Sequence, residues 1–465
     1  MLLEIFDSYR QSIDLYNLRW RKKYVWLNLT HVCRRWRVVV FTSSSRLDLS
    51  ITVGPQKPGH IKTILSSPLP ISIEYHCLYG DITGSAIWRM HAALRHRDRV
   101  REIFFGGSGV IFGKFIRATN YHFPSLESLI LYFPHGYEPD IPATFLRGPD
   151  QPDLRLRRLR LYDASLASVS GLLLSARTLT DLTLNVTCIA AAFDSSHGSF
   201  LLACLQGMQC LCSFDLTTPM NPRDSQSQHS TPKDIVPLLQ LTRFHYSGPS
   251  ILLNNIMSGL SAPSLQDVHF VLCTRFPLFY LPRVIDNVGE EFRSVGVTFD
   301  IGYFRLLSST NSGKIDRSNP SFKFNVNCSP DSIKPISSTP STKLSMAEEL
   351  ALFFPSSNTA ITNWEHVFSL REFLRQFRSV RMLRVDPFIR EVALSLQQDD
   401  GEDLLPLLEE IELSALPISQ STNGPDEEYQ HRAAAELAAF EPFVSAREQT
   451  GRPVNVFHRE MPRSD

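Results

Sequence analysis

Long hydrophobic runs are absent from this sequence, since none reaches the roughly 18–20 residues that a membrane-spanning helix needs. The N-terminus also lacks the charged lead and uninterrupted apolar run of a secretory signal. An excess of one charge is missing too, because 47 Lys and Arg residues balance 47 Asp and Glu residues. This balance removes the usual signal for nucleic acid or a membrane surface as a partner. We therefore expect a cytoplasmic or nuclear protein that binds neither.

The sequence shows no pattern of metal ligands. Its eight cysteines include no C-x-x-C pair and no Cys/His pair at zinc spacing, and Cys210 and Cys212 are too close together for the usual ligand pair. The 14 histidines form no H-E-x-x-H motif. The apolar surroundings of Cys33, Cys204 and Cys273 predict small buried thiols in a reducing compartment. No metal or other cofactor is expected.

Catalytic motifs are represented only by near matches. The glycines of 106–109, followed by Gly113 and Lys114, suggest a phosphate-binding loop. That motif, however, requires glycine where Ser108 stands and Ser or Thr where Phe115 stands. A flexible turn that leaves a strand explains these glycines better. An enzyme built on an α/β fold is therefore the least favoured alternative, and we expect a non-catalytic protein.

What the sequence does contain is an amphipathic helix at Trp26–Phe41. Its apolar residues recur at helical spacings of three and four, and a basic face lies opposite them. The apolar stripe consists of Val25, Leu29, Val32, Trp36 and Val39. A shorter stripe upstream consists of Leu2, Ile5, Phe6 and Tyr9. Two short helices cannot bury each other's stripes alone, so the N-terminus either belongs to the main core or needs a partner.

This N-terminal region resembles an F-box. The resemblance rests on Met1–Phe6, on the THVCRRWR core at Thr30–Arg37 and on the tail Arg46–Leu49. The leucine–proline opening of the family is absent from the sequence, and the resemblance implies that the chain begins inside a truncated first F-box helix. The resemblance implies docking on the Skp-type adaptor of a cullin–RING ubiquitin ligase. The implied adaptor-binding residues are Leu3, Ile5, Phe6, Leu29, Val32, Cys33 and Trp36.

Beyond residue 95 one pattern recurs, apolar-x-x-apolar-x-apolar, at intervals between the low twenties and the low thirties. Its first members are Val100/Ile103/Phe105, Leu126/Leu129/Leu131, Leu156/Leu159/Leu161 and Leu179/Leu182/Leu184. It continues at Leu211/Phe214/Leu216, Leu241/Phe244/Tyr246, Leu265/Val268/Phe270 and Phe292/Val295/Val297, and returns at Val380/Leu383/Val385 and Leu408/Ile411/Leu413. Such a period is typical of leucine-rich repeats, although ordinary strands of an α/β or mixed fold remain an alternative.

The predicted fold is therefore α/β. An F-box-like helical module at 1–50 and a connecting segment at 51–95 precede an irregular leucine-rich-repeat-like solenoid at 96–465, a curved parallel sheet backed by helices. We expect flexible insertions at about 217–233 and 308–345, and a C-terminal cap at about 430–459 in which Pro442 breaks or kinks a helix. The whole resembles divergent fungal F-box/leucine-rich-repeat proteins.

That resemblance implies a substrate-recognition subunit of a Skp–cullin–F-box ligase, which holds an unidentified protein substrate on its repeats. The alternative is an adaptor-independent interaction scaffold without a ligase role. Residues that alternate with the buried ones should line the concave face. These candidate substrate-binding residues are Arg158, Arg160, Asp181, Asp215, Arg243, His245, Asp267, His269, Arg384, Glu410 and Glu412.

Overall fold

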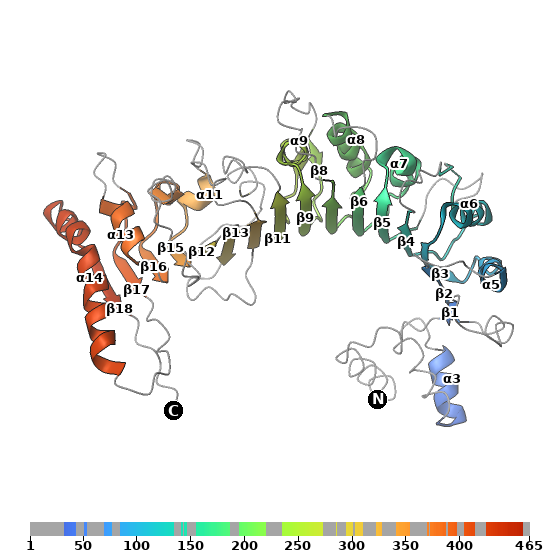
Figure 1. Cartoon of the computed structure of the whole chain (residues 1–465), viewed down its shortest axis with the longest axis horizontal. Helices are drawn as coiled ribbons and strands as arrows, with labels where there is room; N and C mark the ends of the chain where they lie inside the picture. The colour runs from blue at the N-terminus through green and yellow to red at the C-terminus, as the bar shows by residue number, and fades with distance from the viewer. Residues whose placement is uncertain are drawn as a thin grey trace. The chain divides into compact units, whose positions relative to one another are not determined.

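The computed structural model of the protein describes residues 32–42, 51–53, 69–76, 84–133, 141–142, 144–146, 155–186, 195–219, 235–272, 285, 294–300, 303–309, 322–327, 341–353, 370–371, 373–386, 389–397, 404–413 and 425–458. The chain divides into two compact units. The first unit comprises Met1–Ala191 and Ala203–Leu211, and the second comprises Ala192–Leu202 and Cys212–Asp465. Helices and strands alternate along much of both (Figure 1).

The first unit is a parallel sheet with the strand order β1-β2-β3-β4-β5-β6. Its strands are β1 (Ile51–Val53), β2 (Ile71–His76), β3 (Val100–Gly106), β4 (Ser128–Tyr132), β5 (Arg158–Ala164) and β6 (Asp181–Val186). Its helices include α3 (Arg34–Thr42), α5 (Gly84–Leu94), α6 (Gly109–Ala118) and α7 (Leu166–Ser175). The segment 51–95, expected to be a connection, thus contributes two strands and a helix.

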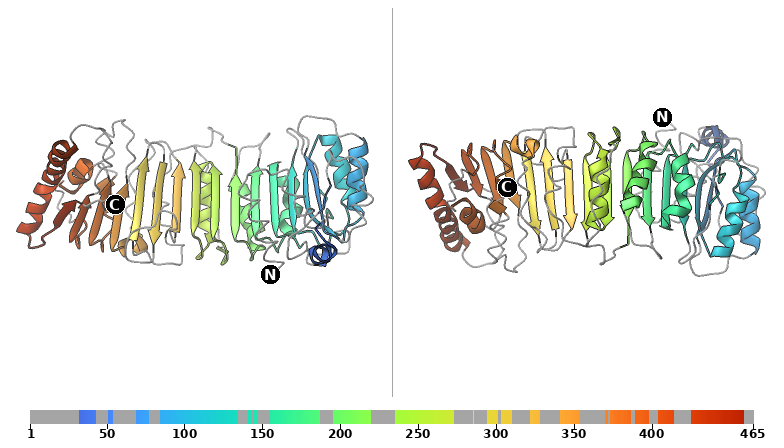
Figure 2. Two further views of the ribbon diagram at one scale, coloured as in Figure 1. Left: turned by 90° about the horizontal axis from the view of Figure 1, so that it is seen from below. Right: turned by 90° about the horizontal axis from the view of Figure 1, so that it is seen from above.

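The apolar triplets form the buried side of this sheet. In β5 the exposed Arg158 and Arg160 alternate with the fully buried Leu159 and Leu161. Strand register places Leu159 beside Leu129 on one side and Leu182 on the other, so equivalent residues form continuous apolar rows. Helices α6 and α7 lie over this side, and the view from the opposite side shows β4–β6 uncovered (Figure 2). Alternation in the sequence thus separates an inner face from an open face.

Phenylalanines join α6 to the sheet. The ring of Phe105 on β3 stacks on Phe115 of α6, with centroids 3.9 Å apart, and meets the edge of Phe112 at 5.6 Å. Phe133 and Phe145 extend the cluster. All five side chains are buried. The glycines at 106–109 lie at the turn from β3 into α6, as the sequence predicts.

The second unit is also built on one sheet, with the order β7-β9-β11-β14-β13-β12-β15-β16-β17-β18. These strands are β7 (Ser213–Thr217), β9 (Arg243–Gly248), β11 (Asp267–Leu272), β12 (Ser294–Asp300), β13 (Tyr303–Ser309), β14 (Phe322–Asn327), β15 (Glu349–Phe353), β16 (Met382–Asp386), β17 (Glu410–Leu413) and β18 (Asn455–His458). A separate parallel pair consists of β8 (Val236–Pro237) and β10 (Leu260–Ser261). The helices are α9 (Ser250–Gly259), α11 (Thr342–Ser345), α13 (Ile389–Gln397) and α14 (Pro425–Gln449), while α8 (Ser195–Gln206) has residues in both units.

The repeat pattern predicts a parallel sheet throughout, but the sheet of the second unit contains antiparallel pairs. Strand β13 runs antiparallel to both of its neighbours, β12 and β14. Only two residues separate β12 from β13, whereas a parallel crossover needs a dozen or more. The stretch 308–345, expected to be a flexible insertion, contains the last residues of β13, including the buried Ser308, and the whole of β14. Of the other expected insertion, 220–233 lies outside the described residues.

Hydroxyl side chains just before some strands form hydrogen bonds to the preceding strand–helix step. The Ser125 hydroxyl donates to the Asp98 carbonyl at 2.6 Å, and Thr178 donates to the Leu156 carbonyl at 2.8 Å. In the second unit Ser264 donates to the Leu239 carbonyl at 2.6 Å. Each bond reaches back across one strand–helix step. Short hydroxyl side chains therefore satisfy backbone carbonyls of the preceding step.

The C-terminal region closes the sheet with β18, which pairs with β17. Helix α14 continues through Pro442 instead of ending there. Phe440 and Phe443 are buried on either side of this proline, while Pro442 itself is exposed. Packing on both sides thus holds the helix across the position where proline removes one amide donor.

Candidate functional site

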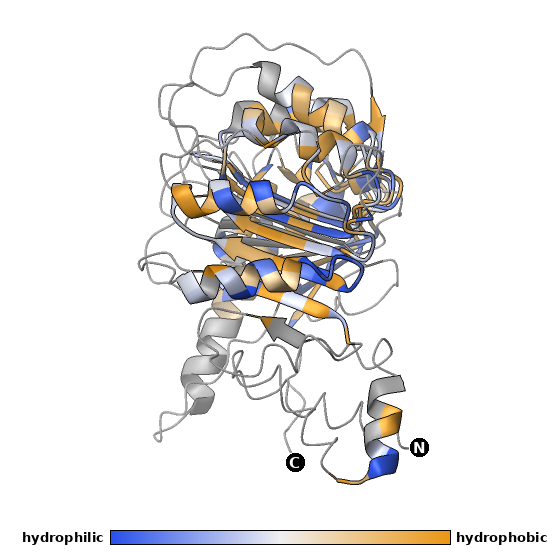
Figure 3. Cartoon of the chain, turned by 90° about the vertical axis from the view of Figure 1, so that its right-hand side faces the viewer, coloured by the Kyte–Doolittle hydropathy of each residue, from blue (hydrophilic) through white to orange (hydrophobic). Residues whose placement is uncertain are grey.

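Helix α3 and the turn just before it expose apolar side chains. Val32 is 59% exposed and Val38 is 60% exposed, and Trp36 is half-buried. Cys33, expected to be a buried thiol, is exposed at the start of the helix, where its Sγ accepts a hydrogen bond from the backbone N–H of Trp36 at 3.4 Å. Figure 3 shows both hydrophobic and hydrophilic residues along this helix. The other adaptor-binding candidates, Leu3, Ile5, Phe6 and Leu29, lie outside the described residues.

The open face of the first unit carries three of the predicted substrate-binding residues. Arg158 and Arg160 project from β5 and are exposed, and the half-buried Asp181 is the register neighbour of Arg158 on β6. The Asp181 carboxylate accepts a hydrogen bond from the Thr180 hydroxyl at 2.7 Å, which holds it in place. The structure therefore brings these three charges together on adjacent strands.

An aromatic cluster that the repeat pattern does not single out lies on the same face. Tyr132 and Tyr162 are register neighbours whose rings stack 4.3 Å apart, and Phe104 meets Tyr132 at 5.6 Å. All three side chains are half-buried. Burial raises the pKa of the Tyr132 phenol, and the neighbouring Tyr162 adds to the rise. The signal was present in the alternation of β4 and β5, where both tyrosines share the register of the outward-facing residues.

In the second unit, five of the predicted residues occupy two rows across β7, β9 and β11. Asp215, His245 and His269 form one row, and Arg243 and Asp267 form the row before it. His245 Nε2 lies 3.5 Å from the Asp267 carboxylate, and the imidazoles of His245 and His269 meet edge to face at 5.6 Å. Arg243 is exposed and the others whose burial is described are half-buried. This second polar surface mixes both charges.

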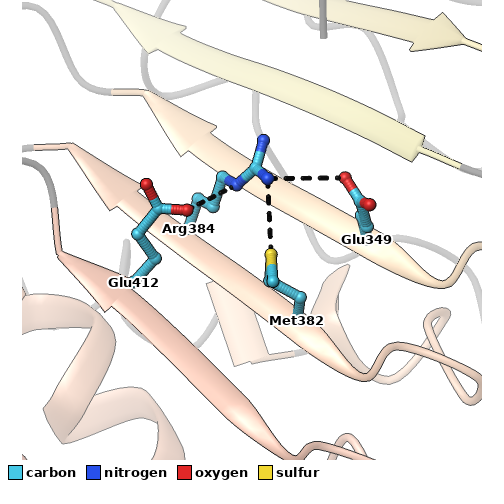
Figure 4. A network of polar contacts seen from close by, with 4 residues as sticks. All are labelled: Glu349, Met382, Arg384 and Glu412. Atoms are coloured by element: carbon cyan, nitrogen blue, oxygen red, sulfur yellow. Dashed lines mark hydrogen bonds and ion pairs between the residues drawn. The ribbon is translucent and has the colours of Figure 1, made fainter. Parts of the chain in front are cut away.

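The remaining predicted residues lie on β16 and β17. Arg384 forms ion pairs with Glu412 (Nε to Oε2, 2.8 Å) and Glu349 (Nη2 to Oε2, 3.8 Å), and its Nη2 also lies 3.4 Å from the Met382 sulfur (Figure 4). Glu412 is buried and Glu410 is half-buried. The charge of Arg384 is thus balanced within the sheet, so this network contributes to holding β15, β16 and β17 together.

A basic groove lies at the amino ends of β3–β5, in the first unit. Its volume is about 460 Å³, and it is lined by Pro70, Asp98, Arg99, Arg101, Pro124, Ser125, Leu126, Glu127, Arg155 and Arg157. Arg99 donates through Nε and Nη2 to the Leu69 carbonyl, at 3.0 and 2.7 Å. Burial lowers the pKa of Arg99, and the charge of Asp98 opposes this shift. Arg101 Nε lies 3.3 Å from a Glu127 carboxylate oxygen.

Within the described ranges, no cluster of three or more His, Cys, Asp or Glu side chains could hold a metal ion. Among the same residues, no helix is both long and apolar enough to cross a bilayer. No protein-family model matches the chain, and no curated protein shows a significant match to it.

Proposed function

We propose that this chain is the substrate-recognition subunit of a Skp–cullin–F-box ubiquitin ligase, with no catalytic role of its own. An F-box-like module at the N-terminus would dock on the Skp-type adaptor, and a leucine-rich-repeat-like solenoid would hold the protein substrate. The observation that carries this proposal is the exposure of Val38 on α3 and of Val32 in the turn before it, with Trp36 of the helix only half-buried. A short helix with such a surface gains stability from a partner that covers it.

The size of the expected contact is sufficient for a stable complex. Full burial of a large apolar side chain contributes roughly 1.5–3 kcal/mol. Val32 and Trp36, together with Leu3, Ile5, Phe6 and Leu29, would therefore offset the several kcal/mol that association costs. The sequence resemblance names these residues, and the exposure of Val32 and the partial exposure of Trp36 are consistent with it.

The open sheet face of the first unit supports a role in binding protein. Tyrosine and arginine are enriched among the residues that dominate binding energy at interfaces, and here Tyr132, Tyr162, Arg158 and Arg160 lie on adjacent strands. A substrate held there would be kept at high effective concentration near the ubiquitin-charged enzyme of the ligase. Recruitment alone then accelerates modification, and no nucleophile or metal on this chain is required.

Binding to purified Skp-type adaptor tests the first half of the proposal. We expect the full chain to co-elute with the adaptor in size-exclusion chromatography, and the variant Val32→Asp with Trp36→Ala to lose this complex. The matched control is Val110→Asp with Trp88→Ala, because these apolar side chains are also exposed, on α6 and α5. Wild type that binds no better than the first variant would leave the adaptor-independent scaffold as the function.

Substrates are sought by proximity labelling in cells under proteasome inhibition. Proteins labelled by the wild-type fusion, but not by a Tyr132→Ala, Arg160→Glu fusion, are the expected substrates. Their abundance should rise when the Val32→Asp, Trp36→Ala variant replaces the wild type. If no labelled protein changes in abundance, recognition occurs without ubiquitin-dependent turnover, and the ligase role fails.

A further inference from the structure

The basic groove of the first unit contains arginines of two kinds. Arg99 and Arg101 are engaged within the protein, by the Leu69 carbonyl and the Glu127 carboxylate. Arg155 and Arg157 are exposed, and no residue in the described ranges forms an ion pair with either. Four arginines face two acids, Asp98 and Glu127, so the lining carries a surplus of positive charge.

We propose that this groove binds an extended acidic segment of a protein partner, with carboxylates of the segment paired to Arg155 and Arg157. The inference rests on the proposed recognition function, because it gives the chemistry of part of the substrate. An arginine guanidinium presents a planar fork of N–H donors that matches a carboxylate. A volume of about 460 Å³ is in the range of sites that enclose several side chains or a small ligand.

The lining favours a peptide over a nucleic acid. Single-stranded nucleic acid is held by aromatic side chains on which bases stack, and no aromatic residue lines the groove. Duplexes need many phosphate contacts along a basic surface, whereas Glu127 interrupts this one between Arg101 and Arg157. A polyanionic backbone would meet that carboxylate, while separate carboxylates can lie on either side of it.

The positions of the two exposed arginines suggest how the acids should be spaced. Arg155 and Arg157 lie two residues apart in the segment that enters β5, on either side of the buried Leu156. Two residues of extended chain span about 7 Å, and their side chains lie on the same side. An extended segment with an acidic residue at every second position has the same repeat and therefore fits best.

Fluorescence anisotropy on the purified full chain tests the inference without the adaptor. The probe is a labelled peptide of Glu-Ser repeats, and the comparison peptide replaces each Glu by Gln. We expect Arg155→Glu with Arg157→Glu to bind the Glu peptide at least tenfold more weakly than wild type. The control, Lys114→Glu with Arg117→Glu, makes the same charge change at exposed positions of α6 and should stay within twofold.

Several results would overturn the inference. Equal binding of the Glu and Gln peptides, no binding by wild type, or unchanged binding by the Arg155/Arg157 variant would each remove the groove as a carboxylate site. A phosphoserine version that binds more than tenfold tighter would reassign it to phosphate, and preference for an oligothymidine would reassign it to nucleic acid. Because adaptor binding is measured separately, failure here is distinguishable from failure of the proposed ligase role.

Discussion

The phenol ring of Tyr132 lies nearly parallel to that of Tyr162, with centroids 4.3 Å apart and an angle of 12° between the planes. The two residues are register neighbours on β4 and β5, so the parallel sheet itself brings the rings together. On the open face this stack remains half-buried and accessible to a partner. It gives the face an aromatic centre beside the exposed Arg158 and Arg160.

Removal of both tyrosines should reveal their coupling. Aromatic pairs contribute about 0.5–1.5 kcal/mol beyond the area that they bury. A double-mutant cycle of Tyr132→Ala and Tyr162→Ala, followed by urea unfolding, should therefore give a coupling energy near the lower end of that range. Tyr121→Ala with Tyr162→Ala is the control and should be additive, because Tyr121 contacts Arg97 instead. Additivity in the first cycle would show that the stack adds nothing to stability.

Tyr75 should make the protein sensitive to alkaline pH. Burial raises the pKa of Tyr75 from 10.0 to about 12, against the opposing effect of Arg89. Between these values the unfolded chain releases the phenolic proton and the folded protein retains it. The contribution of Tyr75 to the free energy of unfolding should therefore not vary with pH below pH 10, and should fall as the pH rises from 10 to 12. Chemical unfolding across this range should show a shallower fall for Tyr75→Phe.

Gly248 should not tolerate a side chain. It has φ +156°, and a Cβ atom would collide with Thr218 Oγ1 and approach the Tyr246 hydroxyl to 2.8 Å. That hydroxyl already donates to the Pro249 carbonyl at 2.6 Å. Gly248→Ala should therefore cost about 2–4 kcal/mol of unfolding free energy. Gly84→Ala is the control, since nothing lies within 4 Å of its Cβ position, and its unfolding midpoint should not fall.

Arg447 should stabilise the C-terminal region. It is buried, and its guanidinium donates to the carbonyls of Leu404 (3.3 Å) and Leu405, the latter in the left-handed backbone region at φ 51°. Arg447→Ala would leave these carbonyls without their donor, at a cost of about 3 kcal/mol. Amide hydrogen exchange in β17 should accelerate accordingly. Glu448→Ala, at an exposed position, should leave this exchange unchanged. Equal acceleration by the two variants would show that the hydrogen bonds of Arg447 do not stabilise the region.

Cysteine reactivity should separate exposed from buried thiols. Burial raises the pKa of Cys204 to about 12, and the thiolate is the form that reacts. With iodoacetamide at pH 8, Cys33 and Cys210, both exposed, should be alkylated well before Cys204, as read by peptide mass spectrometry. Cys204 should react at the rate of the exposed thiols only after unfolding. Equal rates in the native protein would contradict its burial.

Much of the sheet could be predicted because the buried residues of each strand form a recognisable apolar pattern in the local sequence. All ten apolar triplets overlap strands, and their described members, such as Leu129 and Leu131, are buried. Alternation likewise placed Arg158 and Arg160 on the outer face. The antiparallel strand β13 overlaps a further triplet, Ile301/Phe304/Leu306, that begins only nine residues after Phe292 and so falls outside the repeat interval. Its direction escaped prediction because the triplet does not encode strand direction, which depends on the length of the connection.

The sequence by itself determined which residues face inward, because side-chain alternation in a strand follows from local geometry. It also determined the amphipathic character of the α3 region and the absence of an overall charge. Only the tertiary structure decided which outward residues become neighbours. Tyr132 meets Tyr162, and Arg155 and Arg157 join Arg99 and Arg101 in one groove, through parallel pairing between segments about thirty or more residues apart. Such proximity is a property of strand register, and no local pattern encodes it.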